Sequence, residues 1–115
     1  MAEEPATPKL IWEADSTHPD KASHIREALR QVVDPEIGLS VIELGLVRQV
    51  SIADGEARLK MILTTPFCPY GPALLEMARS KAEQASGLAT RIELSPEMWD
   101  PSMMEEGAAA AWGFY

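Results

Sequence analysis

The stretch of this chain whose residue types best suit chemistry is Thr-Thr-Pro-Phe-Cys-Pro-Tyr-Gly-Pro, residues 64–72. Cys68, the only cysteine of the protein, lies there between two prolines, after a strand-like run at 58–63 and before a helical pattern at 73–85. A cysteine just before the first turn of a helix faces unpaired backbone N–H groups and the positive end of the helix dipole, which favour thiolate over thiol. The alternative is a small buried side chain, since free cysteine is often fully buried. Position and composition leave both interpretations of Cys68 open.

Two carboxylates lie in a second turn, Asp-Pro-Glu-Ile-Gly at 34–38. Asp34 can bond nearby backbone amides, as aspartate does in turns, and this local role is the simpler interpretation. The functional interpretation places Asp34 or Glu36 beside Cys68 as a ligand, a base or an orienting group. Glu43 is a further open case, because it lies within the apolar run 41–47, where it is either buried at a cost or directed to solvent.

Other patterns of catalysis and metal binding are missing or weak. The chain has no C-x-x-C pair, H-E-x-x-H, G-x-S-x-G or phosphate-binding glycine loop. His18 and His24, on either side of Asp20, make only a weak metal pattern, and their place at or before the first helix makes them poor bases for a cysteine hydrolase. One thiolate cannot hold an iron–sulfur cluster alone, because such clusters normally take four protein ligands. A cluster at Cys68 would need a second subunit, a partner or carboxylate ligands.

The composition is that of a soluble single domain, with 46% hydrophobic and 24% charged residues among 115. No apolar run approaches the roughly 20 residues that cross a bilayer, and the acidic N-terminus lacks the apolar core of a signal peptide. A single cysteine forms no internal disulfide, which favours a reducing cytoplasm. The net charge of −8 comes from the two ends of the chain, and the nearly neutral middle offers no basic stripe for nucleic acid.

Hydrophobic periodicity predicts an α/β (α+β) domain whose elements follow the order α-β-β-α-β. The first helix is expected to begin near Asp20 and to end at Asp34-Pro35, because the residue before a proline is disfavoured in helices. An Asp-Gly turn at 54–55 joins two strands into a hairpin, the second helix stops at Gly87, and a third strand covers 88–94. Alternation of buried and wet residues predicts a small two-layer domain, a three-stranded mixed sheet with both helices on one face.

Three segments are expected along the chain. Residues 1–20 carry five acids and three prolines without a periodic apolar face, and predict a flexible acidic leader. Residues 21–95 form the α/β domain. Residues 96–115, rich in methionine and aromatic side chains, predict a tail that packs on this domain, with a short helix capped by Ser102. An exposed tail would instead be a surface for a partner.

Several motifs, in order along the chain, resemble the SufT/PaaD-like family of metal–sulfur (iron–sulfur) cluster assembly factors. They are the Asp-Pro-Glu-Ile-Gly turn at 34–38, Val-Ile-Glu-Leu-Gly-Leu-Val at 41–47, Leu-Thr-Thr-Pro-Phe-Cys-Pro at 63–69 and Trp-Asp-Pro-Ser-Met-Met-Glu-Glu at 99–106. The resemblance runs from Ala22 to Tyr115. The chain lacks the further cysteines of the PaaD-type branch of that family and the ATPase domain to which another branch is fused.

The resemblance implies a role in maturing iron–sulfur proteins, with Cys68 as the reactive cysteine and with Asp34, Glu36 and Thr65 near it. A thiolate of low pKa would hold an iron ion or a labile iron–sulfur cluster transiently, and the carboxylates would tune its release. The expected partners are iron–sulfur assembly proteins, apo iron–sulfur targets, a separate ATPase carrier and a second copy in a homodimer, with no membrane and no nucleic acid.

The sequence thus supports the hypothesis of a cytoplasmic assembly factor that acts through Cys68 and is not an enzyme. The rival hypothesis is an adaptor that docks apo-targets or assembly partners, with Cys68 only structural. The two differ over the reactivity of the thiol, which is fast for a carrier at neutral pH and slow for a buried, structural cysteine.

Overall fold

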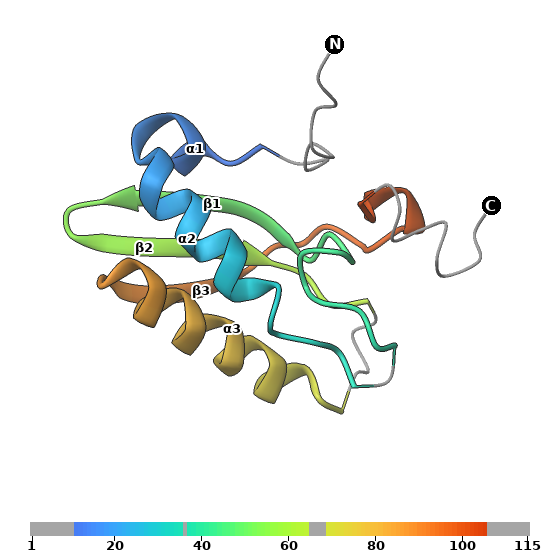
Figure 1. Ribbon diagram of the computed structural model, residues 1–115. Helices are drawn as coiled ribbons and strands as arrows, with labels where there is room; N and C mark the ends of the chain where they lie inside the picture. Colours follow the sequence, from blue (N-terminus) through green and yellow to red (C-terminus); the bar gives the residue numbers. More distant parts are fainter. Residues whose placement is uncertain (1–10, 36, 65–68, 106–115) are drawn as a thin grey trace, which may run out of the picture.

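The computed structural model describes residues 11–35, 37–64 and 69–105 (Figure 1). Its helices are α1 (Glu13–Thr17), α2 (Pro19–Leu29) and α3 (Gly71–Ser86), its strands β1 (Val47–Ala53), β2 (Glu56–Met61) and β3 (Ala89–Leu94), and a 3-10 turn, η1, covers Pro101–Met103. From α2 to β3 the elements follow the predicted order α-β-β-α-β. No helix in the described parts of the chain is long and apolar enough to cross a membrane.

The three strands form one sheet in the order β1-β2-β3. β1 pairs antiparallel with β2, and β2 pairs parallel with β3, with α3 as the crossover between them. Figure 1 shows α2 and α3 side by side over the same face of this sheet. The predicted mixed sheet with helices on one face is therefore confirmed.

The hairpin between β1 and β2 is closed by the residues that the sequence singles out. Asp54 has φ 54° and Gly55 has φ 73°, and two successive positive φ angles are what a tight hairpin turn of the favoured hand requires. The turn fixes a register in which Ile52 lies opposite Ala57 and Val50 opposite Leu59. A one-residue slip would bring every buried side chain of β2 to the wet face.

One hydrophobic core lies between the sheet and the two long helices. Buried side chains at helical spacing on α2 and on α3 face the sheet. Alternate residues of β2 face the helices and complete the core. These residues are Ala22, Ile25, Leu29, Leu74, Ala78, Ala82, Ala57, Leu59 and Met61. The side chains between them on β2, Arg58 and Lys60, are exposed on the other face of the sheet.

The first long helix ends at Leu29, earlier than the Asp34-Pro35 boundary predicted from the sequence. The residues after it turn back and pair with the chain ahead: Val33 forms a bridge with Ser40, and Val41 N–H donates to Val32 O at 2.9 Å. This long-range pairing satisfies backbone groups that a continued helix would have bonded internally, so it ends the helix before proline does.

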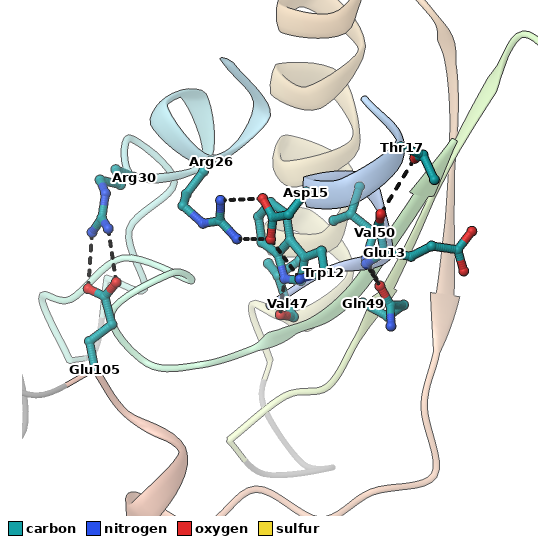
Figure 2. A network of polar contacts seen from close by, with 10 residues as sticks. All are labelled: Trp12, Glu13, Asp15, Thr17, Arg26, Arg30, Val47, Gln49, Val50 and Glu105. Atoms are coloured by element: carbon teal, nitrogen blue, oxygen red, sulfur yellow. Dashed lines mark hydrogen bonds and ion pairs between the residues drawn. The ribbon is translucent and has the colours of Figure 1, made fainter. Parts of the chain in front are cut away.

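The expected leader boundary at residue 20 is too late. Trp12 is only 3% exposed, Ala14 is fully buried, and residues 13–17 form α1. The indole Nε1 of Trp12 donates to Val47 O at 3.2 Å, which places this segment along the outer edge of β1 (Figure 2). The packed part of the chain therefore includes Trp12 and α1, ahead of the expected boundary. Residues 1–10 lie outside the described residues.

An ion pair stacked on an aromatic ring joins α1 to α2 (Figure 2). The two terminal nitrogens of Arg26 donate to the two carboxylate oxygens of Asp15 at 2.9 and 3.0 Å, and Arg26 Cζ lies 3.9 Å from the centre of the Trp12 ring. The hydrogen bond from Arg26 is the main cause that lowers the pKa of the Asp15 carboxyl, against burial, which raises it. Backbone N–H of Trp12 adds to the lowering through a 2.7 Å hydrogen bond.

Asp15→Asn should lower the free energy of unfolding at neutral pH by about 1 kcal/mol, since it removes a partly exposed, doubly hydrogen-bonded ion pair. The folded-state pKa lies below the unfolded value, so the carboxylate stabilises the fold above the unfolded pKa of about 4 and ceases to do so as the pH falls through the folded pKa. Urea unfolding of both proteins along an acid pH series measures this. A stability difference that stays constant as the pH falls would contradict it.

The chain beyond β3 packs back on the segment before β1. Trp99 Nε1 donates to Leu44 O at 2.7 Å, and Met104 is fully buried. Glu105 receives both terminal nitrogens of Arg30 at 3.0 and 2.9 Å, 75 residues away along the chain, and its backbone N–H donates to Glu43 O at 2.9 Å. These contacts fix residues 99–105 on the domain, and residues 106–115 lie outside the described residues.

Ser102, the expected cap of a short helix running to residues 108–111, lies instead inside a 3-10 turn at Pro101–Met103, and Met104 after it is extended. The part of the expected helix from residue 106 on lies outside the described residues. The cap is Asp100, whose Oδ2 accepts a hydrogen bond from Ser102 N–H at 2.8 Å. Because Asp100 supplies the cap hydrogen bond and proline suits the first helical position, Asp100-Pro101 sets the start of the turn.

Candidate functional site

The two ends of the loop that carries Cys68 are held together. β2 ends at Met61, and α3 begins at Gly71, whose position is buried. A Cβ built on Gly71 would lie 2.8 Å from Leu63 Cδ1, so the start of the helix packs directly against a side chain just beyond the end of β2. Leu74 N–H donates to Tyr70 O at 2.8 Å and fixes the first turn of α3.

The turn at 34–39 is closed by its own backbone. Asp34 N–H donates to Leu39 O at 2.9 Å, and Asp34 O accepts from Gly38 N–H at 2.7 Å. Gly38 has φ 84°, in the left-handed region that glycine adopts most easily. Asp34 itself is 2% exposed. The main chain of Asp34 therefore closes the turn, and its side chain is directed into the protein. The two interpretations of the Asp34 carboxylate, a local bond to backbone amides or a role beside Cys68, both stay predictions.

The Asp34 turn lies against the start of the helix that follows Cys68. A mostly apolar cavity of about 220 Å³ is lined on one side by Val33 and Pro35 and on the other by α3 and the residue before it. The residues on the α3 side are Tyr70, Ala73, Leu74 and Met77. The fold thus brings together three segments that are distant in the sequence: the Asp34 turn, the end of β2 and the start of α3.

A further turn, residues 40–46, supports the end of β2. Ser40 Oγ accepts from Glu43 N–H at 3.1 Å, while Glu43 Oε1 accepts from Ser40 N–H at 2.8 Å. This reciprocal pair is a capping box, and it answers the open case of Glu43: the carboxylate is half-buried and hydrogen-bonded to the chain. Leu46 O in turn accepts from Ile62 N–H at 2.9 Å, which ties the turn to the residues leading into the loop.

Of the four predicted site residues, the structure describes Asp34. Glu36, Thr65 and Cys68 lie outside the described residues, so their proximity to Asp34 stays a prediction. Among the described residues, no group of three or more histidine, cysteine or carboxylate side chains is arranged to hold a metal ion. His18 Nδ1 lies 2.9 Å from Thr17 Oγ1, and His24 is exposed on α2.

A second hollow lies beside the end of β2. It has a volume of about 480 Å³ and is mainly apolar, with Ile62, Leu63 and Thr64 from the end of β2 and Leu94, Met98 and Trp99 from the chain after β3 among its lining residues. Met98 is 83% exposed at its rim. Sequence reasoning did not find this groove, because it depends on β2 and β3 ending side by side in a parallel pair.

The candidate site is therefore a strand-to-helix connection that carries one cysteine. Leu63 and Gly71 pack together at its base, and the turn of the buried Asp34 lies against the start of α3. The sequence itself gives the family: residues 22–94 match the family model described as "Iron-sulfur cluster assembly protein". The chain belongs to that family, and the resemblance seen in its motifs is confirmed.

The similar proteins with curated names agree with this membership. A Porphyromonas gingivalis protein named "Fe-S protein maturation auxiliary factor" is 41% identical over 90 residues, which cover 75% of this chain and 85% of that protein. The Staphylococcus aureus "Fe-S protein maturation auxiliary factor SufT" is 33% identical over 86 residues, 71% of this chain and 97% of that protein. An "Iron-sulfur cluster carrier protein" of Synechocystis is 37% identical over 60 residues, only 17% of its own length.

Solved structures share the fold. A Bacillus anthracis domain described as DUF59, of unknown function, superposes with a TM-score of 0.77 over 87% of this chain and 98% of that one, at 20% identity. The Thermotoga maritima protein TM0487 superposes with a TM-score of 0.59 at 29% identity, over 93% of this chain and 99% of that one.

Proposed function

We propose that this protein takes part in the maturation of iron–sulfur proteins as a carrier that holds iron or a labile cluster on Cys68 and passes it to an apoprotein. Family membership supports the iron–sulfur role, and the names of the similar proteins, maturation factors and cluster carriers, support it further. The observation that carries the proposal is the position of the only cysteine in the sequence, between the end of β2 and the start of α3, where Gly71 packs against Leu63.

Two features of this position suit weak, exchangeable binding of iron. A thiolate is a soft ligand that binds iron well, and a nearby helix N-terminus favours the thiolate form of a cysteine. One protein sulfur is also too few for a closed cluster site, so cargo held there remains able to leave. A carrier needs this lability, whereas a storage site needs the opposite.

Asp34, Glu36 and Thr65 are proposed to act around Cys68. The buried Asp34 lies in a turn that packs against the first turns of α3, which follows the cysteine directly. In the proposal, carboxylates from this turn complete the coordination of an iron ion while it is held and release it when a target offers better ligands. The chain supplies binding and release, with no catalysed reaction of its own.

The proposed partners are iron–sulfur assembly proteins and apo iron–sulfur targets, with a separate ATPase carrier as a source of cargo. The proposed compartment is the cytoplasm, where a reducing environment keeps a lone cysteine free. The groove of about 480 Å³ beside the end of β2 favours a second candidate function, an adaptor that docks a target there with Cys68 only structural.

Alkylation of Cys68 at neutral pH distinguishes these two functions. The carrier predicts that the folded protein reacts with iodoacetamide faster than the same chain unfolded in urea, with a half-maximal rate below the pH of about 8.5 at which an ordinary cysteine ionises. Because the chain has one cysteine, mass spectrometry of the intact protein reports this site alone. Slower reaction of the folded protein would reject the carrier and leave the adaptor.

A further inference from the structure

The two edges of the sheet are treated differently by the fold. Along the β1 edge, Trp12 and α1 cover the strand, with Trp12 Nε1 bonded to Val47 O and Glu13 N–H bonded to the side chain of Gln49. At the other edge, β3 pairs with β2 and with no other strand among the described residues. An uncovered edge strand presents backbone donors and acceptors that can pair with another chain.

The backbone groups available on the β3 edge can be assigned. Ser95 N–H donates to Met61 O at 2.9 Å, so Ser95 directs its backbone at β2. Residues two apart on a strand direct their N–H and C=O groups the same way, and adjacent residues direct them oppositely. Thr90, Ile92 and Leu94 therefore direct their backbone groups away from β2, toward the open edge.

Charges select one way of pairing β3 with a second β3. An antiparallel pair of two β3 strands can form hydrogen bonds between the outward backbone groups of Thr90, Ile92 and Leu94 in more than one register. These registers differ in which side chain of the second copy lies opposite Arg91 and Glu93. Centring the pair on residue 91 sets Arg91 against its copy, and centring it on residue 93 sets Glu93 against its copy. Centring the pair on Ile92 sets Arg91 of each copy against Glu93 of the other. Opposite charges that face each other directly across two strands stabilise a sheet, whereas like charges destabilise it.

The same register fills a hollow on the helix side of the strand. A cavity of about 550 Å³ lies between β3 and α3. Leu75, Thr90, Ile92 and Leu94 line it, together with Pro72 and the charged side chains of Glu56, Glu76, Arg79 and Arg91. Leu94 is 63% exposed in the single chain. With Ile92 on the two-fold axis, Leu94 of each copy lies opposite Thr90 of the other and enters this hollow, so the exposed leucine becomes buried.

We propose that this protein forms a two-fold symmetric dimer through antiparallel pairing of β3 with β3, centred on Ile92, which joins two three-stranded sheets into one. Two-fold dimers are the commonest protein oligomers, and this interface is self-complementary as such symmetry requires. The dimer goes beyond the proposed function and does not depend on it. Because the paired strands run in opposite directions, the two Thr64 residues that lead into the cysteine loops lie at opposite ends of the joined sheet, and each copy keeps its own site.

Charge exchange at the edge tests the dimer by sedimentation of the full chain over a concentration series. Wild type should form a reversible dimer. Arg91→Glu and Glu93→Arg should each raise the dissociation constant at least about tenfold, because each turns two attractive pairs into two repulsive ones. An equimolar mixture of the two variants should regain the dimer, since every facing pair across a mixed dimer then joins opposite charges.

Two controls keep the test decisive. Ile11→Lys, on an exposed side chain beside Trp12 at the covered β1 edge, should leave the dimer unchanged. Thermal unfolding shows that each single variant is folded, which matters because Arg91 also lies 3.5 Å from Glu56 on the neighbouring strand. A wild type that stays monomeric, or a mixture that dissociates as readily as the single variants, would overturn the proposal and leave the edge to a strand of another protein.

Discussion

Gly45→Ala should destabilise the protein by about 3 kcal/mol. Gly45 has φ 74°, where a residue with a Cβ is strained by roughly 1 kcal/mol or more. A Cβ there would also meet the carbonyl oxygen of Met103, with the Met103 carbonyl carbon at 2.8 Å, and overpacking of this kind adds about 1–3 kcal/mol. The shift of the urea unfolding curve measures the loss.

Gly87→Ala is the matched control for this change. Gly87 has φ 72°, almost the same backbone conformation, but no atom lies within 4 Å of a Cβ built there. It should show the strain of the positive φ without the clash, a loss of about 1 kcal/mol. If Gly45→Ala costs no more than Gly87→Ala, the chain around Met103 does not pack on the turn at 40–46 as described.

Cys68→Ser should abolish transfer of an iron–sulfur cluster to an apo-enzyme in a purified, anaerobic system. Serine keeps nearly the same size but offers a hydroxyl, which does not ionise near neutral pH and is a poor ligand for iron. Mutating a residue that only supports a metal ligand typically lowers metal affinity or activity by about 10–100-fold. Loss of the ligating sulfur itself should therefore lower transfer by at least as much. The activity that the apo-enzyme gains after mixing with the reconstituted protein measures transfer.

His24→Gln serves as the control for that experiment. His24 is an exposed side chain on α2, away from the three segments that meet at the loop. Its replacement should leave transfer at the wild-type level. A loss of transfer would instead indicate that the two histidines take part in metal binding. Equal thermal unfolding of wild type and Cys68→Ser shows that a loss of transfer is not a loss of fold.

Local chemistry is what the sequence predicted best. The pair Asp54-Gly55 predicted the hairpin, because few other residue pairs adopt two positive φ angles. Gly87 was predicted to end the second long helix, and it ends α3 in the left-handed conformation. The order of elements followed from the change between helical and alternating periodicity. In these cases the determining residues are neighbours in the chain, so the pattern contains the answer.

Long-range contacts account for what the sequence did not predict. Trp12 is held by Val47 O and by the Arg26–Asp15 pair, and nothing near it in the sequence indicates α1. The early end of α2 depends on pairing with residues 40 and 41. Glu43 is different: its capping box with Ser40 follows the S-x-x-E pattern, which was readable in the sequence.

For the candidate site, the residues come from the sequence, and the structure adds the positions of Asp34, the end of β2 and the start of α3. Asp34 is buried in a turn that packs on the start of α3, and its proximity to Cys68 stays a prediction. The side-chain positions of Glu36, Thr65 and Cys68 remain predictions. The apolar groove at the end of β2 and the open edge of β3 emerged only from the parallel pairing of these strands.

The most direct test of the central claim is rescue in cells that lack this gene. The activity of an iron–sulfur enzyme is compared after expression of wild type and of Cys68→Ser, with the abundance of both proteins measured by immunoblot. The account predicts that wild type restores the activity and that Cys68→Ser leaves it at the level of the deletion strain. Equal rescue by the two proteins at equal abundance would contradict a carrier that works through this thiol.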